Sequence, residues 1–154
     1  MELKNKVVLI TGGSRGIGKA TAIALAKEGC SVIINFKSDI KAAQEVLADC
    51  NRYSKGNIAI GADVSKEKEV IKMFDEIKQK FLNLDMLVNN AGIFDDNDNP
   101  TNIEAFENIY RSNFLSCVIT TKYAEPLMQA GKIINISSIH GRLKKKRFQR
   151  KRNN

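Results

Sequence analysis

The sequence predicts an α/β fold in which a doubly wound parallel sheet of about five strands carries helices on both faces. Short runs rich in β-branched residues alternate with stretches of helical periodicity along most of the chain. A glycine-rich turn joins the first of these runs to the first helical stretch. Because repeated strands and helices at this spacing build right-handed crossover units, we expect the strands to be parallel.

The first two strand and helix units are expected within residues 6–49. The run KVVLIT at 6–11 predicts a strand, and a helical pattern over 17–28 ends at Gly29. A second strand is predicted over 31–36. Ser38 is the expected N-cap of a second helix, which should run to about residue 49.

The middle of the chain repeats this alternation. A third apolar run covers residues 57–60, and Ser65 is expected to open an amphipathic helix that runs to about residue 81. The fourth strand is predicted over 86–89. The apolar side chains at helical spacing in the intervening helix are Val70, Ile71, Phe74, Ile77 and Phe81.

The remaining predicted elements are a loop, a long helix and a fifth strand. The polar segment DDNDNP at 95–100 is typical of a loop, which we expect at the rim of a site. A helical stretch follows from residue 103 to about 129. The run KIINIS at 132–137 predicts the fifth strand.

Composition indicates a protein with one globular core, and its cysteines indicate a cytoplasmic setting. The chain has 154 residues, of which 43% are hydrophobic, which is enough for a single domain. Its three cysteines, Cys30, Cys50 and Cys117, are odd in number and widely spaced, which favours reduced thiols over a disulfide framework or a metal site. No apolar run approaches the roughly 20 residues of a membrane span, and the N-terminus does not have the layout of a signal peptide.

The formal net charge of +8 belongs to the last thirteen residues. Residues 142–154 contain eight of the 25 basic residues and none of the 17 acidic ones, so residues 1–141 carry 17 of each sign. We therefore expect a folded domain over 1–141 and a disordered basic tail over 142–154. Charge confined to a tail argues against a specific nucleic-acid surface, although the tail would bind anions without reading a sequence.

The turn TGGSRGIG at 11–18 has the chemistry of a phosphate-binding loop. Glycine permits a tight turn and close approach of the backbone to a pyrophosphate, and the free amides at a helix N-terminus stabilise negative charge. Taken alone, the turn is equally compatible with an ordinary connection between a strand and a helix.

Four further motifs accompany this turn. Asp63 and Val64 follow the third predicted strand, and the sequence NNAG at 89–92 ends the fourth. Asn113 lies in the long predicted helix. The sequence INISS at 134–138 ends the fifth strand.

In this order and spacing, the motifs resemble the short-chain dehydrogenase/reductase family, particularly its 3-oxoacyl-carrier-protein reductases and glucose dehydrogenases. The resemblance covers residues 3–141. It implies a Rossmann fold and an oxidoreductase that transfers hydride between NAD(P) and a small-molecule carbonyl or alcohol. It assigns catalysis to Ser138 and Asn113, with Ser138 favoured over Ser137. It assigns cofactor contacts to Gly12, Ser14, Arg15, Gly16, Ile17, Gly18, Asp63, Val64, Asn90, Ala91 and Gly92.

Each assignment has a structural alternative. Asp63 could end a strand or cap a turn, and residues 90–92 could form only a turn. Asn113 could bond locally within its helix, and Ser138 could end a strand without chemistry. His140, the only histidine, is a candidate acid or base by residue type, but the family does not use that position.

The resemblance stops before the active site is complete. In the family, a serine binds the substrate oxygen, a tyrosine transfers the proton, and a lysine one helical turn later lowers the pKa of that tyrosine. This pair should fall near Lys151, but no tyrosine follows Tyr123. A truncated or frame-shifted chain is our first interpretation and a genuine basic arm the second. We expect an incomplete sheet and no activity from this chain alone.

Full-length members of the family form homo-oligomers, and the resemblance implies that this chain lacks part of that interface. It also implies that the loops which select the substrate lie largely beyond Ser138. A nucleotide-binding module without catalysis is therefore an alternative function. A nucleic-acid binder that uses the basic tail is a third.

The cofactor is expected to be NADP(H) rather than NAD(H). An NAD-selective site places a carboxylate at the end of the second strand, where it binds the ribose 2′-OH. Here that stretch reads Asn35-Phe36-Lys37-Ser38, and Arg15 projects from the glycine loop. Lys37 and Arg15 would then face a 2′-phosphate, unless both are only solvated surface residues.

Overall fold

The computed structural model describes residues 2–94 and 102–138. The whole polar loop predicted over 95–100, the candidate His140 and the basic tail lie outside the described residues. The predicted disorder of the tail therefore stays a prediction.

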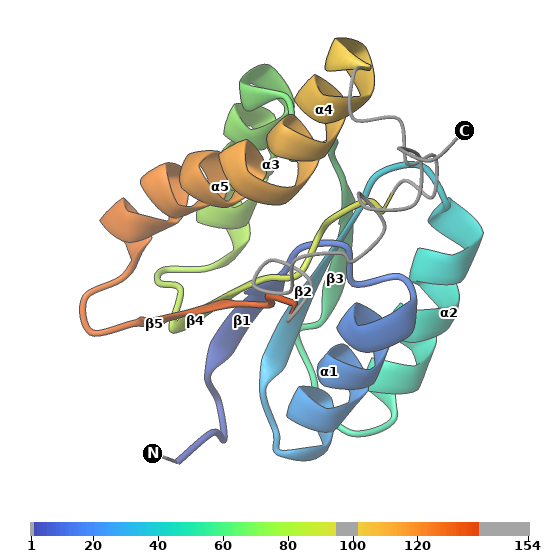
Figure 1. Cartoon of the computed structure of the whole chain (residues 1–154). Helices are drawn as coiled ribbons and strands as arrows, with labels where there is room; N and C mark the ends of the chain where they lie inside the picture. Colours follow the sequence, from blue (N-terminus) through green and yellow to red (C-terminus); the bar gives the residue numbers. More distant parts are fainter. Residues whose placement is uncertain (1, 95–101, 139–154) are drawn as a thin grey trace, which may run out of the picture.

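The described residues form a five-stranded parallel sheet in the order β3-β2-β1-β4-β5 (Figure 1). Leu9 of β1 pairs with Ile33 of β2 on one side and with Leu87 of β4 on the other. The predicted fold class and number of strands are confirmed. The strands are β1 (Val7–Ile10), β2 (Ser31–Phe36), β3 (Ile58–Gly61), β4 (Met86–Asn89) and β5 (Lys132–Asn135).

Helices cover both faces of the sheet. Helices α1 and α2 lie on one face, and α3, α4 and α5 lie on the other (Figure 1). A π-helical turn, η1 (Arg111–Leu115), joins α4 to α5, and a 3-10 turn, η2 (Glu125–Leu127), ends the segment. The helices are α1 (Gly16–Lys27), α2 (Ile40–Asn51), α3 (Glu67–Lys80), α4 (Ile103–Tyr110) and α5 (Ser116–Ala124).

Two buried clusters hold the layers together. Alternate side chains of a strand point to opposite faces, so Leu9 and Ile33 pack with Phe74 of α3, whereas Ile10 and Ile34 pack with α1 and α2. The side chains of these five residues are fully buried. Coverage on both faces explains why the central strands are apolar without alternation.

Several predicted boundaries and caps were wrong. Asp39, rather than Ser38, caps α2 by accepting the Ala42 N–H at 3.0 Å. Ser65 does not cap α3, because its hydroxyl donates to the Asp63 carboxylate at 2.6 Å. Ile71 is exposed, and Met73 takes a core position that the pattern missed.

The long predicted helix exists, but it is not uniform. It passes through the π-helical turn η1 and ends at Leu127, two residues before its predicted end. Exposed apolar side chains lie along it, including Phe106, Tyr110 and Phe114. All four residues of β5, including Ile133 and Ile134, are also exposed, as expected for the edge strand of an incomplete sheet.

All three cysteines are free thiols, and burial raises the pKa of Cys50 to about 11. Within residues 2–94 and 102–138, no helix is both long and apolar enough to cross a membrane. The same residues contain no cluster of side chains suited to a metal ion.

Asp85 joins three strands at their amino ends. Its carboxylate accepts the Val7 N–H at 2.9 Å and the Lys6 ammonium at 3.0 Å, while its carbonyl accepts the Lys132 N–H at 2.9 Å. Burial works to raise the pKa of Asp85, but the hydrogen bonds from Val7 and Lys6 hold that pKa below its ordinary value. The ionised carboxylate therefore stabilises the folded sheet.

We predict that Asp85→Ala lowers the free energy of unfolding by about 1–3 kcal/mol at neutral pH, because the Val7 N–H loses its acceptor. Since the folded-state pKa is depressed, this contribution is present above the ordinary carboxyl pKa and is lost as pH falls through the folded-state value. Urea unfolding of both proteins at pH 7 and in acid measures this. Asp75→Ala, at an exposed ion pair on α3, is the control. Equal losses in the two variants at pH 7 would contradict the role of Asp85.

Candidate functional site

The glycine loop follows β1 and opens α1 at the carboxyl edge of the sheet. Gly12 and Gly16 have φ values of 62° and 54°, a region that glycine adopts without steric cost. Gly18 is required for a different reason. A Cβ atom there would lie 2.6 Å from the Asn90 Nδ2 atom and would also collide with the Gly12 carbonyl. The loop is therefore pressed closely against the end of β4.

Thr11 and Asn90 connect this loop to the NNAG segment. The Thr11 hydroxyl oxygen accepts the Asn90 and Ala91 N–H groups at 3.0 and 2.9 Å. The Asn90 side chain donates back to the carbonyls of Thr11 and Gly12 at 2.9 and 3.1 Å. These four hydrogen bonds help to join the ends of β1 and β4. The Asn90 side chain therefore contacts the glycine loop, in addition to any part that residues 90–92 play in a turn.

A cavity of about 330 Å³ opens beside this loop at the carboxyl ends of β1 to β4. The structure brings ten of the predicted cofactor residues to its wall, namely Gly12, Ser14, Arg15, Ile17, Lys37, Asp63, Val64, Asn90, Ala91 and Gly92. Gly16 and Gly18 belong to the loop without lining the cavity. Sequence reasoning missed Asn35, Ser38, Asp39, Ala62, Ser65, Ile93 and Ser112. Most of these residues are sequence neighbours of a predicted site residue. Their position next to the end of a strand was the sequence signal that could have identified them as part of the site.

The charged group deepest in the wall is Asp63, whose side chain is 9% exposed. It accepts hydrogen bonds from the hydroxyl and N–H of Ser65 and pairs with the Lys37 ammonium at 2.9 Å. Burial works to raise the pKa of Asp63, but the bonds from Ser65 and Lys37 hold that pKa below its ordinary value. The Asp63 carboxylate is therefore ionised at neutral pH. Lys37 lies against it.

Asn113 lies in the π-helical turn η1, next to Ser112, which lines this cavity. Its side-chain oxygen accepts the Ile93 N–H, and its Nδ2 donates to the Ile93 carbonyl, both at 2.8 Å. A Cβ atom on Gly92 would approach the Asn113 Oδ1 atom to 3.2 Å. Asn113 thus bonds the segment after β4, twenty residues away, rather than bonding locally as the structural alternative supposed.

Ser138 follows β5 and is exposed. The strand is fixed in register with β4, since Asn89 Nδ2 donates to Asn135 Oδ1 at 2.9 Å and the Ile136 N–H reaches the Asn89 carbonyl at 2.9 Å. Ser138 is not among the residues that line the cavity beside the glycine loop. Neither of the two predicted catalytic residues, Asn113 and Ser138, is therefore among the residues that line this cavity.

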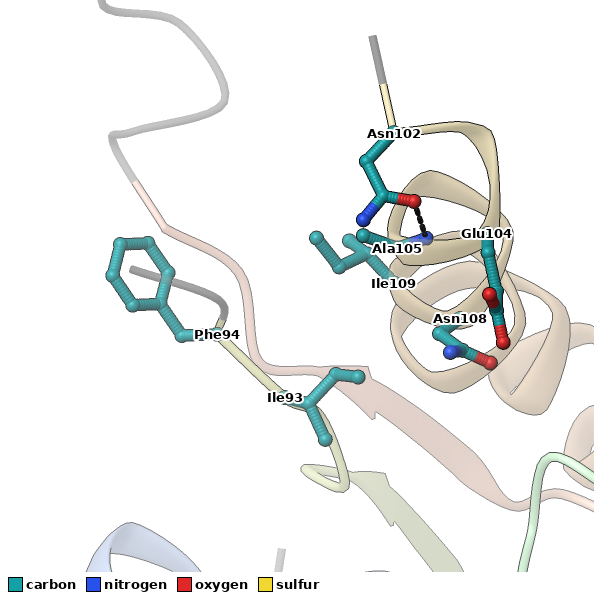
Figure 2. Close-up of a pocket in the computed structure, with 7 residues that line it drawn as sticks. All are labelled: Ile93, Phe94, Asn102, Glu104, Ala105, Asn108 and Ile109. Atoms are coloured by element: carbon teal, nitrogen blue, oxygen red, sulfur yellow. Dashed lines mark hydrogen bonds between the residues drawn. The ribbon is translucent and has the colours of Figure 1, made fainter. Parts of the chain in front are cut away.

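A second cavity, of about 310 Å³, lies between Ile93, Phe94 and the first turns of α4. Figure 2 shows Ile93 and Phe94 on the segment after β4 and Asn102 just before α4, where its side chain caps the helix by accepting the Ala105 N–H at 3.1 Å. None of the predicted site residues lines this cavity. The candidate functional site is the cavity beside the glycine loop.

Comparison with known proteins decides the family. A model of the short chain dehydrogenase family matches residues 6–149. The chain belongs to the short-chain dehydrogenase family. The match continues past residue 141, where the resemblance was expected to end.

Relatives in this family are named as reductases and dehydrogenases. The chain is 40% identical over 140 residues to the hydroxynaphthalene reductase-like protein Arp2 of Metarhizium acridum. The aligned residues cover 89% of this chain and 52% of the relative. It is 38% identical over 143 residues to the 3-oxoacyl-[acyl-carrier-protein] reductase of Synechocystis, covering 90% of this chain and 58% of that protein. The chain therefore spans about half the length of the curated relatives it matches.

Solved short-chain dehydrogenase structures have the same fold. A short-chain dehydrogenase/reductase from Serratia marcescens superposes with a TM-score of 0.87 and 29% identity, covering 94% of this chain and 60% of that one. A 7α-hydroxysteroid dehydrogenase solved with NADH and 7-oxo glycochenodeoxycholic acid gives 0.84 and 29%, covering 94% and 57%. The predicted family is confirmed. Its members use NAD(P) cofactors, so the carboxyl-edge cavity is the place to consider for one.

We predict that Gly18→Ala lowers the free energy of unfolding by about 1–3 kcal/mol, because the added methyl group forces the loop away from Asn90. Gly16→Ala is the control, since no atom lies within 4 Å of its Cβ position and only its positive φ opposes the change, at about 1 kcal/mol. Chemical denaturation of the three proteins measures the difference. A larger loss for Gly16→Ala than for Gly18→Ala would contradict the packing described.

Proposed function

We propose that the chain supplies the nucleotide-binding half of an NADP(H)-dependent oxidoreductase, which interconverts a small-molecule carbonyl and its alcohol. The observation that carries this proposal is the carboxyl-edge cavity, in whose wall the glycine loop, Lys37, Asp63 and the NNAG segment meet. Ligands of open α/β sheets bind at this edge of the strands.

The phosphates would lie at the N-terminus of α1. The Gly12 and Gly13 amides are already engaged with Asn35, by its side chain at 3.3 Å and its backbone carbonyl at 2.8 Å. The amides of the first turn of α1, which begins at Gly16, have no carbonyl partner within the helix. They and the helix dipole favour a pyrophosphate at this position.

The adenosine would lie between the glycine loop and the segment after β3. Asp63 and Val64 form that wall, and the ionised Asp63 carboxylate is an acceptor suited to an adenine amino group. Asn90, Ala91 and Gly92 line the cavity beyond the loop, on the side of Asn113 and β5. The nicotinamide would lie toward that side, where Asn113 of η1 bonds the segment after β4 and Ser138 follows β5.

Two cations support a preference for NADP(H). Lys37 and Arg15 line the same cavity, and both side chains are exposed at its mouth. Asp39 also lines it, a carboxylate that sequence reasoning missed, but its Oδ1 atom is engaged as the N-cap of α2. A ribose 2′-phosphate would gain charge-assisted hydrogen bonds from Lys37 and Arg15 that a 2′-hydroxyl could not match.

We predict that the 154-residue chain binds NADPH more tightly than NADH. Lys37→Ala and Arg15→Ala should each weaken NADPH binding about tenfold and leave NADH binding nearly unchanged, because only the 2′-phosphate loses a charged partner. Fluorescence titration with both nucleotides measures this. Lys72→Ala, which removes a cation of α3 away from the cavity, is the control. Equal or tighter binding of NADH by the unaltered chain would remove the preference.

For catalysis we propose Ser138 and Asn113, with Ser138 hydrogen-bonding the substrate oxygen. The two hydrogen bonds between Asn113 and the Ile93 backbone, one donated by each residue, would hold the segment after NNAG in place. A bound NADP(H) would supply or accept the hydride. No tyrosine follows Tyr123 in these 154 residues, so the proton donor that the family uses after the serine is not among them. A 3-oxoacyl thioester is one substrate class that fits the relatives.

We predict no measurable carbonyl reduction by the 154-residue chain, because an alkoxide developing near Ser138 has no positioned acid, and such an acid contributes roughly 10² to 10⁴-fold. Oxidation of NADPH with acetoacetyl thioesters and simple ketones tests this. Substrate-dependent oxidation that disappears in Ser138→Ala would contradict the prediction. A chain that binds NADPH without turnover would act as the nucleotide-binding module alone.

We also propose a cytoplasmic setting and self-association of the whole protein. Three free thiols support the first. The exposed apolar side chains of α4 and η1, including Phe106, Tyr110 and Phe114, support the second. We propose no membrane contact and no specific nucleic-acid partner.

A further inference from the structure

Asn35 is a polar side chain buried in an otherwise apolar strand. It lies near the carboxyl end of β2 and is 1% exposed, whereas Val32, Ile33 and Ile34 before it are fully buried apolar residues. Burying a carboxamide costs free energy unless its donors and acceptor all find partners. Its contacts therefore indicate what this position requires.

The partners of Asn35 come from two different loops. Its Oδ1 atom accepts the Gly12 N–H at 3.3 Å, and its backbone carbonyl accepts the Gly13 N–H at 2.8 Å. Its Nδ2 atom donates to the Ala62 carbonyl at 3.0 Å and to the Ile60 carbonyl at 3.4 Å. One residue therefore joins the glycine loop after β1 to the segment after β3.

The two segments are those between which the adenosine and phosphates would lie. Ala62 directly precedes Asp63 and Val64, and its own N–H is held by the Phe36 carbonyl at 2.8 Å. Gly12 is held on its other side by Asn90, whose Nδ2 donates to the Gly12 carbonyl. Loss of the Asn35 side chain would leave the Gly12 N–H without this acceptor and would separate the loop from Ala62.

We infer that Asn35 is a positioning residue for the dinucleotide, which sets the distance between the phosphate-binding glycine loop and the adenine-side segment at Asp63. The inference rests on the proposed nucleotide-binding function and adds a residue that carries no direct chemistry. A purely structural role is the alternative. The chain contains a control for that alternative, a second asparagine that hydrogen-bonds to the same strand.

That control is Asn57, which holds the opposite end of β2. Its Oδ1 atom accepts the Val32 N–H at 2.8 Å, and its Nδ2 atom donates to the Ser54 carbonyl and the Asn51 side chain. It is 9% exposed and does not line the carboxyl-edge cavity. Asn35→Ala and Asn57→Ala therefore remove matched sets of hydrogen bonds from one strand, near the site and far from it.

The test measures NADPH binding by titration for the full 154-residue chain and its variants at a temperature where each is folded. Asn35→Ala should weaken NADPH binding about tenfold, because an unsatisfied Gly12 amide and a freed loop oppose the bound geometry. Asn57→Ala should unfold at a lower denaturant concentration yet bind NADPH as the unaltered chain does. In hydrogen exchange, the Gly12 amide should lose protection in Asn35→Ala and keep it in Asn57→Ala.

Should Asn35→Ala not fold, Asn35→Ser applies the same test, since its hydroxyl is too short to reach both loops but keeps a polar group in the site. Asn35 variants that bind NADPH as tightly as the unaltered chain would overturn the inference. Equal weakening in Asn57→Ala would also overturn it, because the effect would then follow from loss of stability. An unaltered chain that does not bind NADPH would instead overturn the proposed function.

Discussion

The Gly12 peptide unit is held from both sides by carboxamides, and the candidate site forms around it. The Asn35 side chain, near the end of β2, accepts a hydrogen bond from the Gly12 N–H. The Asn90 side chain, after the end of β4, donates one to the Gly12 carbonyl. These contacts are possible because β1 lies between β2 and β4 in the sheet, and because parallel strands end at one edge. With Gly12 fixed, the loop turns into α1, and Ile17 of the first turn of that helix lines the cavity. The strand order thus determines where a phosphate could bind.

The charges at this edge are arranged around Asp63. Its carboxylate is the least exposed charged group of the cavity wall and is kept ionised by Ser65 and Lys37. Lys37 is mostly exposed, so its ammonium is held in place by the pair with Asp63 while one side remains open to the cavity mouth. The same carboxylate could then orient both an adenine amino group and the cation that would bind a 2′-phosphate.

The opposite end of the site is less complete. Ser138 and all of β5 are exposed, and the relatives continue for about as many residues again.

The fold class, the strands and ten of the residues that line the candidate cavity were predicted from the sequence, because the relevant signals are local. Apolar runs locate strands, and glycines before a helix locate the loop. What it missed depends on contacts between distant segments. Asn35 has no motif of its own, and its role appears only when β2 lies between Gly12 and Ala62. Asp39 and Ser38 were exchanged as caps because both residue types suit that position, and the backbone geometry decides between them. The exposure of β5 agrees with the incomplete sheet that the resemblance predicts, in which the apolar run KIINIS forms an edge strand.

The account depends on a dinucleotide binding at the carboxyl edge of the sheet rather than at the cavity beside α4. Titration of the ¹⁵N-labelled 154-residue chain with NADPH, followed by amide chemical shifts, tests this most directly. We predict changes that concentrate at the glycine loop from Gly12 to Gly18, at Lys37 and at Asp63, with little change at Asn102, Ala105 and Asn108 of α4. Changes confined to α4, or no changes at millimolar NADPH, would contradict the account.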